Sequence, residues 1–265
     1  CSGCNRPSLV CICDELPRPP LRPSLPLLLL QHTREAARKL GSADLLRLSI
    51  DGELMQTVVG RTLGHVRRSA AWERYAHAEG RTPLLLFPSP CALSAAQVTA
   101  RMEERGERFF LVAVDATWKE AKEICARNTA SRHVEPSQDP PATKHETQAE
   151  EGSAPDPSCF ERPIECLSLD PSEEGCSPLF AGCRKPLSPS HLCTLEAVAL
   201  ALRLLAPSRD DGDGLAEALL KPMRKMVAHQ VALTNGREVH RVERPGYIPG
   251  LTEAAASAAK AVGGD

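Results

Sequence analysis

Three segments of the chain are almost continuously apolar, which is typical of strands buried on both faces of a sheet: 25–31, 82–87 and 108–114. Helical patterns lie between or after them, at about 34–48, 93–105, 118–126, 191–205 and 214–233, and a short strand is expected near 163–169. Thr33 is the expected cap of the first helix, and Gly106 is the expected end of the second. This alternation predicts an α/β fold with a largely parallel sheet flanked by helices.

The alternation stops between about residues 130 and 183. Ten of the 23 prolines fall between 136 and 189, beside many Ser, Glu and Asp residues. We therefore expect a low-complexity insertion within a main domain at 25–250. The Pro-rich residues 14–24 are interpreted as a linker, and the Ala/Gly-rich residues 251–265 as a disordered tail.

The charge balance excludes some classes of protein. Lys and Arg total 32 and Asp and Glu total 34, so a strongly basic, histone-like binder is excluded, although a local basic face is not. No apolar stretch reaches about 18 residues, so no membrane span is expected. No signal peptide is visible, but the sequence begins abruptly at Cys1 and looks trimmed. We expect an intracellular protein, cytoplasmic or nuclear, with an organellar location left open and no obligate protein partner evident.

Four of the 11 cysteines cluster within the first 13 residues, with the spacing C-x2-C-x6-C-x-C: Cys1, Cys4, Cys11 and Cys13. A C-x2-C pair can hold one metal ion from a tight turn, and a second pair nearby completes a tetrahedron of thiolates. The alternative is a pair of disulfides in a secreted module, but the rest of the chain looks like a large intracellular domain. We interpret residues 1–24 as a structural Cys4 zinc knuckle followed by its linker.

Polar residues stand where the three predicted strands end: Gln31-His32, Phe87-Pro88-Ser89 and Asp115-Ala116-Thr117-Trp118. Ligands of parallel sheets bind at these carboxyl ends. Asp115 is a candidate carboxylate that orients or deprotonates a substrate, and Trp118 is a candidate surface for a base or a cation. The alternatives are that Asp115 or Thr117 only caps a helix and that Trp118 fills the core.

Other polar side chains near these ends have similar alternatives. His32 is either a ligand contact or an ordinary strand-end histidine. Glu35 is either a ligand contact or an acid that favours a helix start and pairs with Arg38. Thr194 is a plausible cap of the late helix, and Glu196 lies in its first turn. No Gly-x-Gly-x-x-Gly, Walker, Gly-x-Ser-x-Gly or zinc-deaminase motif is present.

A basic stretch runs from residue 61 to residue 81, with only two acids in it: Arg61, His65, Arg67, Arg68, Arg74, His77 and Arg81. Trp72 and Tyr75 lie among these cations and are candidates to stack on an unpaired base. Lys221, Arg224 and Lys225 share one late helix. Such clusters can neutralise nucleic-acid phosphates, and the alternative is a solvated surface.

Five segments, in order over about residues 1–240, resemble those of the DTW-domain tRNA-uridine aminocarboxypropyltransferase family. They are the cysteine cluster, Gln31-His32-x-x-Glu35, Leu86-Phe87-Pro88-Ser89, Asp115-Ala116-Thr117-Trp118-x-x-Ala121-Lys122, and Arg184-Lys185-Pro186 with Thr194-Leu195-Glu196-Ala197. Leu219-Leu220-x-Pro222 with His229-Gln230 is similar to the last helix of the eukaryotic branch. Any one motif is weak, but five in order are specific.

The resemblance implies a SPOUT-like α/β fold, S-adenosylmethionine as donor, tRNA as partner and Zn²⁺ in the knuckle. It implies transfer of the 3-amino-3-carboxypropyl group to N3 of a uridine, with Asp115 as base or as the group that orients the donor's amino group. The implied donor-binding residues are His32, Glu35, Phe87, Pro88, Ser89, Asp115, Thr117, Trp118, Thr194 and Glu196. The implied RNA-binding residues are Arg67, Arg68, Arg74, Arg184, Lys221 and Arg224.

The sequence also departs from the family pattern. Thr33 replaces a proline, Ala116 a glycine and Cys193 a serine, and residues 40–44 do not match. Two other functions are therefore kept beside the first. One is a non-catalytic, zinc-bearing RNA-binding module, and the other is an S-adenosylmethionine-dependent RNA methyltransferase of related fold.

Overall fold

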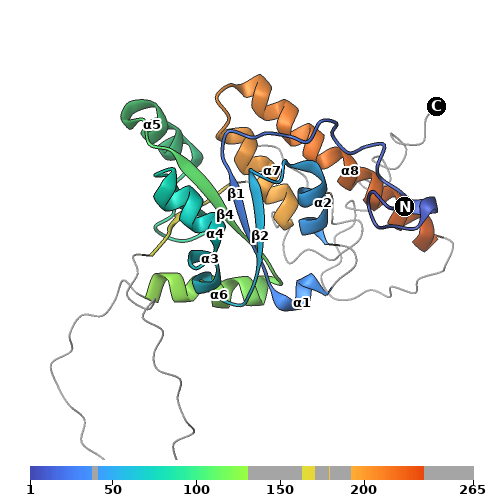
Figure 1. The fold of residues 1–265 in the computed structure, drawn as a ribbon, viewed down its shortest axis with the longest axis horizontal. Coiled ribbons are helices and arrows are strands. Elements are labelled where there is room, and N and C mark those ends of the chain that lie inside the picture. The colour runs from blue at the N-terminus through green and yellow to red at the C-terminus, as the bar shows by residue number, and fades with distance from the viewer. Residues whose placement is uncertain (38–40, 131–162, 171–178, 180–191, 236–265) are drawn as a thin grey trace, which may run out of the picture.

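The computed structural model describes residues 1–37, 41–130, 163–170, 179 and 192–235 (Figure 1). Five strands in this part of the chain form one sheet in the order β2-β1-β4-β3-β5, and every neighbouring pair is parallel. The strands are β1 (Leu27–Gln31), β2 (Met55–Val59), β3 (Thr82–Leu86), β4 (Phe109–Asp115) and β5 (Glu165–Leu167). The expected α/β fold with a parallel sheet is confirmed.

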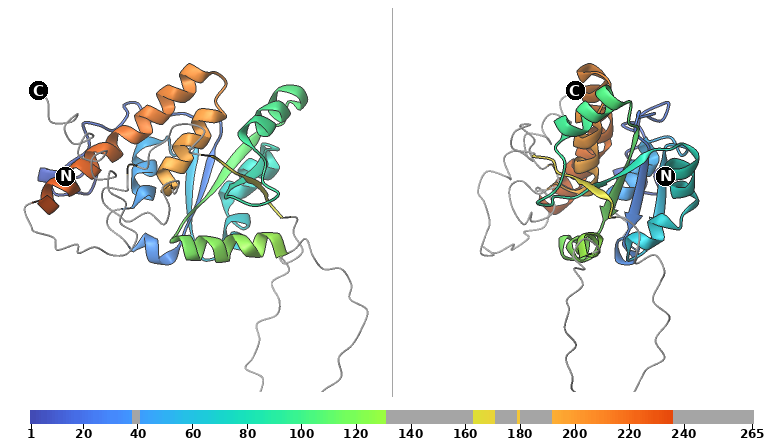
Figure 2. Two further views of the ribbon diagram at one scale, coloured as in Figure 1. Left: turned by 180° about the vertical axis from the view of Figure 1, so that it is seen from behind. Right: turned by 90° about the vertical axis from the view of Figure 1, so that its left-hand side faces the viewer.

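Helices cover both faces of the sheet, as Figures 1 and 2 show. One face carries α2 (Ser42–Ser49), α5 (Ala95–Arg105), α7 (Thr194–Leu204) and α8 (Arg209–Asn235). The other face carries α3 (Leu63–Arg67), α4 (Ala70–Trp72), the π-helix Glu73–Ala78 and α6 (Trp118–Ala130). The short helix α1 (Thr33–Ala36) and the start of α6 lie at the end of the sheet where the strands finish. A 3-10 turn, Ser8–Val10, lies near the N-terminus.

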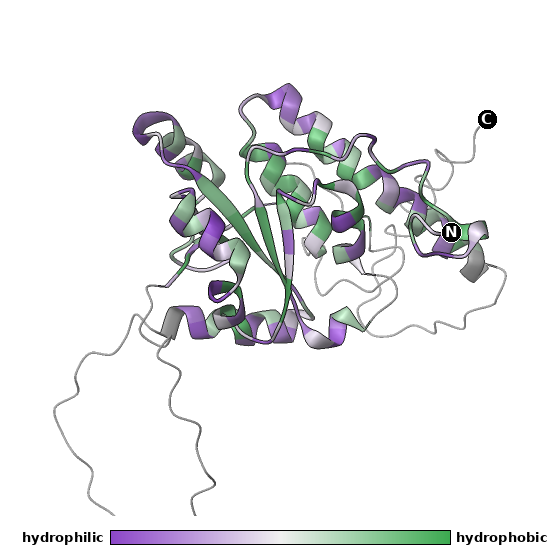
Figure 3. Ribbon diagram, in the orientation of Figure 1, coloured by the Kyte–Doolittle hydropathy of each residue, from purple (hydrophilic) through white to green (hydrophobic). Residues whose placement is uncertain are grey.

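The central strand β1 separates two hydrophobic cores. Leu27 and Leu29 point into the core under α2, α7 and α8, whereas Leu28 and Leu30 point into the core under α3 and α6. All four side chains are fully buried. A parallel strand buried on both faces is continuously apolar instead of alternating, which explains the leucine run. In Figure 3 the central strands are coloured as hydrophobic, whereas the outer end of α5 is coloured as hydrophilic.

The N-terminal segment packs against α8 and shares its core. Ile12 is fully buried, and the Arg6 guanidinium donates to the Met226 sulfur at 3.0 Å. The Lys221 amine forms an ion pair of 3.0 Å with Glu15. Figure 1 shows the N-terminus beside the end of α8. The cysteine cluster is therefore fixed to the last described helix of the fold.

The element boundaries expected from the sequence need two corrections. The single helix expected at 34–48 is wrong, because α1 and α2 are separate, with Gly41 as the N-cap of α2. The cap expected at Thr33 is also wrong, since the His32 side chain accepts a hydrogen bond from the Arg34 N–H and caps α1. Strand β2 escapes prediction because it is a short edge strand, Met-Gln-Thr-Val-Val, in which only Met55 is buried and no continuous apolar run marks it.

The remaining expectations about the fold concern one strand, one helix end, the insertion and the tail. The strand expected near 163–169 is confirmed as β5, and Gly106 ends α5 in the left-handed conformation. Most of the insertion expected at 130–183 and all of the tail at 251–265 lie outside the described residues. Among the helices that are described, none is long and apolar enough to cross a membrane.

Candidate active site and metal centre

The ends of β1 and β4 meet at the carboxyl edge of the sheet. Gln31 and Asp115 lie opposite each other in the parallel register. The Asp115 side chain is almost fully buried, and its two carboxylate oxygens accept from Gln31 Nε2 and Ser42 Oγ, each at 3.0 Å. An ionised carboxylate accepts hydrogen bonds and donates none, so it suits these two donors. Asp115 ends a strand and does not cap α6.

A second buried carboxylate, Glu120, links three neighbouring segments. Its Oε2 accepts from the backbone N–H of Thr117 at 3.1 Å and from the Thr117 hydroxyl at 2.8 Å. The Glu120 backbone N–H donates in turn to the Thr117 hydroxyl oxygen at 3.4 Å, which completes a capping box at the start of α6. Its Oε1 accepts from Arg34 Nη1 at 3.0 Å and lies 3.4 Å from His32 Nδ1. Glu120 therefore ties the end of β1 and α1 to the start of α6.

The surroundings of Glu120 favour its charged form. Burial raises the pKa of this carboxyl, but the hydrogen bonds from Thr117, together with nearby His32 and Arg34, outweigh burial and lower the pKa below its usual value. Glu120 is 8% exposed. Glu120 therefore stays negatively charged beside the candidate site. Its partners lie in two segments, the end of β1 with α1 and the start of α6.

The end of β3 is joined to the same edge by aromatic contacts. Phe87 and Trp118 stack with ring centroids 5.6 Å apart and an angle of 29° between their planes. The Lys122 ammonium lies 5.4 Å from the centre of the Trp118 ring. Pro88 is exposed and Ser89 is half-buried in the loop that follows. The structure therefore brings the three strand-end segments together, and it leaves a partly open aromatic surface beside Asp115.

The start of α7 is organised around Glu196. Its carboxylate accepts from the backbone N–H groups of Cys193, at 2.7 Å, and of Leu179. Cys193 occupies the N-cap position, so the cap expected at Thr194 is wrong. Burial, followed by the charge of Glu196, raises the pKa of the Cys193 thiol well above its ordinary value. Cys193 is therefore not a reactive thiolate. Among the described residues, no hydrogen bond joins Glu196 to Asp115.

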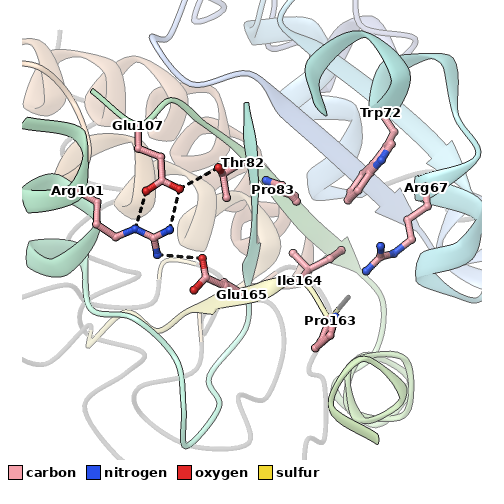
Figure 4. A pocket seen from close by; sticks show the side chains of 9 residues that line it. All are labelled: Arg67, Trp72, Thr82, Pro83, Arg101, Glu107, Pro163, Ile164 and Glu165. Atoms are coloured by element: carbon pink, nitrogen blue, oxygen red, sulfur yellow. Dashed lines mark hydrogen bonds and ion pairs between the residues drawn. The ribbon is translucent and has the colours of Figure 1, made fainter. Parts of the chain in front are cut away.

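A cavity of about 780 Å³ lies away from these residues, beside the amino ends of β3 and β5 (Figure 4). On one side, Arg101 forms ion pairs with Glu107 at 2.7 Å and with Glu165 at 2.9 Å. On the other side lie Arg67 and Trp72. Arg101 is already paired with both acids, and the cavity includes none of the residues around Asp115. It is not the candidate active site.

The aromatic residues of the basic stretch are in the core. Tyr75 is fully buried and donates its hydroxyl hydrogen to the Glu53 carbonyl oxygen at 2.8 Å. Trp72 is 7% exposed and packs edge-on against Phe110, with Arg67 over its ring. Tyr75 is enclosed on all sides, so the expectation that it stacks on a base is wrong. The Trp72 ring is buried except where it lines the cavity, and its stacking on a base stays a prediction.

The cations predicted to bind RNA have different surroundings. Arg74 pairs with Glu79 at 3.1 Å. On α8, Lys221 pairs with Glu15, and Arg224 Nη2 donates to Glu217 at 2.8 Å. Arg68 is exposed at the end of α3. Arg184 lies outside the described residues, so the structure gives it no position.

The four cysteines predicted as metal ligands form one cluster. Their sulfur atoms all lie within 4.8 Å of one another, and the pairs Cys1–Cys13 and Cys4–Cys11 are 3.5 and 3.8 Å apart. All four are free thiols. A Cβ at Gly3 would come within 2.9 Å of the Cys13 sulfur, so glycine allows the close approach. Four sulfurs at this spacing can hold a metal ion.

The thiols of this cluster cannot all be ionised without a cation. Burial raises the pKa of Cys4, but hydrogen bonds, from the Ile12 backbone first, lower it to about 7. The pKa of Cys13 rises to about 11, because of burial first and then because of the neighbouring thiols. Since thiolates are the form that binds metal, a cation at the centre would relieve this repulsion.

The sequence does not predict three features of the site: the hydrogen bond of Gln31 to Asp115, the contact of Ser42 with Asp115, and the place of Glu120 in the site. A signal for Glu120 exists, because Thr117-x-x-Glu120 is a capping-box spacing. Gln31 stands in a strand-end motif, but nothing in the sequence shows that its amide faces Asp115. Ser42 is 73 residues from Asp115 in the chain, and only the fold brings the two together.

The chain is similar in sequence to proteins of known name. A DTW domain family model matches residues 1–231. A "tRNA-uridine aminocarboxypropyltransferase 2" from Drosophila melanogaster is 32% identical over 130 residues, which is 49% of this chain and 49% of the relative. A protein of that name from Macaca fascicularis is 28% identical over 133 residues, which is 50% of this chain and 43% of the relative.

A third relative covers more of the chain. It is a "tRNA-uridine aminocarboxypropyltransferase A" from Arabidopsis thaliana, 24% identical over 240 residues, which is 87% of this chain and 80% of the relative. The chain spans about half the length of the first two relatives. No solved structure matches the chain significantly.

Proposed function

Because the chain belongs to the DTW domain family over residues 1–231, we propose that it is a tRNA-uridine aminocarboxypropyltransferase. It transfers the 3-amino-3-carboxypropyl group of S-adenosylmethionine to N3 of a uridine in tRNA. The observation that carries this proposal is that the matched span contains the buried Asp115 carboxylate, held at the strand ends by Gln31 and Ser42. The names of the relatives support the reaction.

The reaction requires a nucleophile that is weak until it loses a proton. Uracil N3 gives its proton to Asp115 and, with the electron pair thus freed, forms a bond to the carboxypropyl carbon next to the donor's sulfur. The bond between that carbon and sulfur breaks, its electrons stay on sulfur, and neutral 5′-methylthioadenosine leaves. The proton then passes to solvent. A positioned base contributes about 10²- to 10⁴-fold to such a step.

The donor supplies an activated sulfonium, so the main task of the protein is orientation. The carboxypropyl chain, and not the methyl group, must face the uridine. In a SPOUT-like fold of this kind, the donor lies at the carboxyl edge of the sheet. The donor-binding residues that we propose are His32, Glu35, Phe87, Pro88, Ser89, Asp115, Thr117, Trp118, Thr194 and Glu196. The half-buried Phe87–Trp118 stack at this edge supports the placement of an adenine beside it.

For the cysteine cluster we propose a structural zinc ion. Four Zn–S bonds of about 2.3 Å in a tetrahedron separate the sulfurs by about 3.8 Å. The two measured separations, 3.5 and 3.8 Å, fit that geometry. Four thiolates leave no open position on the metal, so the ion would stabilise the packing of the N-terminal segment against α8 and take no part in the transfer.

A comparison of variants at Asp115 tests the proposed role. With tRNA and S-adenosylmethionine, Asp115→Asn is expected to lower kcat about 100-fold or more, because the amide keeps the shape but cannot accept the N3 proton. The exposed Asp210→Asn is the matched control and is expected to behave as the wild type. If Asp115→Asn raises only the KM for the donor, Asp115 binds the donor and is not the base. If the wild-type protein transfers nothing, the proposed function is wrong.

A further inference from the structure

Exposed cations surround the carboxyl edge of the sheet where Asp115 lies. The Arg34 and Lys119 side chains are 77% and 87% exposed. Arg61 and Lys122 are exposed as well. We call these four residues the carboxyl-edge rim: Arg34, Arg61, Lys119 and Lys122. Only Arg61 belongs to the basic stretch recognised in the sequence, and none belongs to the set of RNA-binding residues predicted from it.

Contacts between the segments place the rim on one edge. Arg61, which follows β2, donates to the Thr33 hydroxyl at 3.3 Å, next to Arg34. Arg34 reaches across to Glu120, the neighbour of Lys119, at 3.0 Å. Figures 1 and 2 show α1 and the start of α6 side by side at this end of the sheet. The loop after β2, α1 and the start of α6 therefore form one continuous surface.

The charge of this surface is positive outward and negative inward. The acids Glu35, Asp115 and Glu120 lie at the same edge, but all three are buried. Glu123 is exposed, and its carboxylate is 4.0 Å from the Lys119 amine, which is a weak contact in water. Polyanions that approach this edge therefore meet cations first.

The cations predicted from the sequence are placed less favourably. Arg74, Lys221 and Arg224 each already pair with an acid: Glu79, Glu15 and Glu217. A phosphate that binds one of them must compete with that acid, so little net charge remains for binding. Two rim cations are paired as well, Arg34 with Glu120 and Lys119 with Glu123. Their side chains are nevertheless 77% and 87% exposed, against 50% or less for Arg74 and Arg224, and the rim lies next to the candidate base.

We propose that tRNA phosphates bind the carboxyl-edge rim, so that an unpaired uridine reaches Asp115 from that side. The inference rests on the proposed function for the identity of the nucleic acid. It makes the rim, which includes Arg61 of the basic stretch, the main docking surface in place of α8 and the rest of that stretch. Each phosphate neutralised changes the slope of log affinity against log salt by about 0.9 on B-form DNA and by about 0.7 on single strands.

A pair of matched double variants tests the rim. Arg61→Gln with Lys119→Gln removes two rim charges, while Arg74→Gln with Arg224→Gln removes two paired cations. Fluorescence anisotropy with labelled tRNA, at several salt concentrations, measures the affinity. For the rim variant we expect a loss on the order of tenfold at 0.1 M salt and a salt slope smaller by about 1.5. The paired-cation variant is expected to lose less than about threefold.

Calorimetric titration with S-adenosylmethionine separates this inference from the proposed function. The rim variant is expected to bind the donor as the wild type does, since the Arg61 side chain contacts Thr33 and the Lys119 side chain contacts Glu123, and neither partner belongs to the proposed donor site. Equal losses of tRNA affinity in both double variants, or unchanged affinity in the rim variant, would overturn the inference. Wild-type protein that does not bind tRNA would overturn it as well. If the rim variant loses tRNA affinity as expected but the wild type transfers nothing, the proposed function is wrong and the inference about the docking surface is retained.

Discussion

Replacement of Glu120 by glutamine probes the charged network beneath the candidate site. The amide keeps the shape of the side chain but removes a buried charge that accepts from Thr117 and Arg34. A hydrogen bond to a charged group is worth about 1.5–3 kcal/mol. The ion pair with Arg34 adds only about 0–1 kcal/mol, because that side chain is 77% exposed. We expect Glu120→Gln to lower the free energy of unfolding by about 1–3 kcal/mol at pH 7.

The pH dependence of this loss has a definite sign. The pKa of Glu120 is lower in the folded protein than in the unfolded chain, where a glutamate titrates at about pH 4.3. Its charge therefore stabilises the fold fully above the unfolded pKa, and the stabilisation is lost as the pH falls through the folded pKa. The difference between wild type and Glu120→Gln should shrink steadily below about pH 4.

Urea unfolding at several pH values measures the difference, with Glu123→Gln as the matched control. Glu123 is 61% exposed on the same helix and lies 4.0 Å from the Lys119 amine, so its replacement should change stability by less than about 0.5 kcal/mol. If Glu120→Gln costs no more than Glu123→Gln, the network is not stabilising. A difference that stays constant from pH 7 to the acid range would refute the assigned charge.

Three further predictions concern the scaffold. In thermal scans, Gly212→Ala should lower the free energy of unfolding by about 1–3 kcal/mol, because its Cβ would collide with the Arg203 carbonyl oxygen. A variant as stable as the wild type would contradict this close packing. Gly214→Ala, with nothing within 4 Å of the new Cβ, should stabilise α8 by about 0.5–1 kcal/mol in the same thermal scans. Cys11→Ser should remove about one bound zinc per chain by atomic absorption, and wild-type protein purified without stoichiometric metal would contradict the metal site.

The fold could be predicted where local sequence determines structure. The leucines of β1 form a continuous apolar run because both faces of that strand are buried, and the polar residues that follow the strands mark the carboxyl edge. The cysteine spacing likewise predicts the cluster that the fold assembles. These features depend on residues that are near one another in the chain.

The rest depends on contacts between distant residues. Trp72 lies among arginines in the sequence, yet it faces the core, and no local pattern separates these two cases. The pairing of Lys221 with Glu15 joins opposite ends of the chain, so a helix that looks basic in sequence is partly neutralised in the fold. Ser42 reaches Asp115 only because α2 begins beside the end of β4. The RNA-binding surface that we propose could therefore not be derived from the charge pattern alone.

The most direct test of the proposed reaction follows the atoms of the donor. The protein is incubated with tRNA and S-adenosylmethionine that carries carbon-13 either in the aminocarboxypropyl chain or in the methyl group, and the digested nucleosides are analysed by mass spectrometry. We predict that the chain label appears on uridine and that the methyl label leaves with 5′-methylthioadenosine. A methyl label on any nucleoside, or no label on uridine from either donor, would contradict the account.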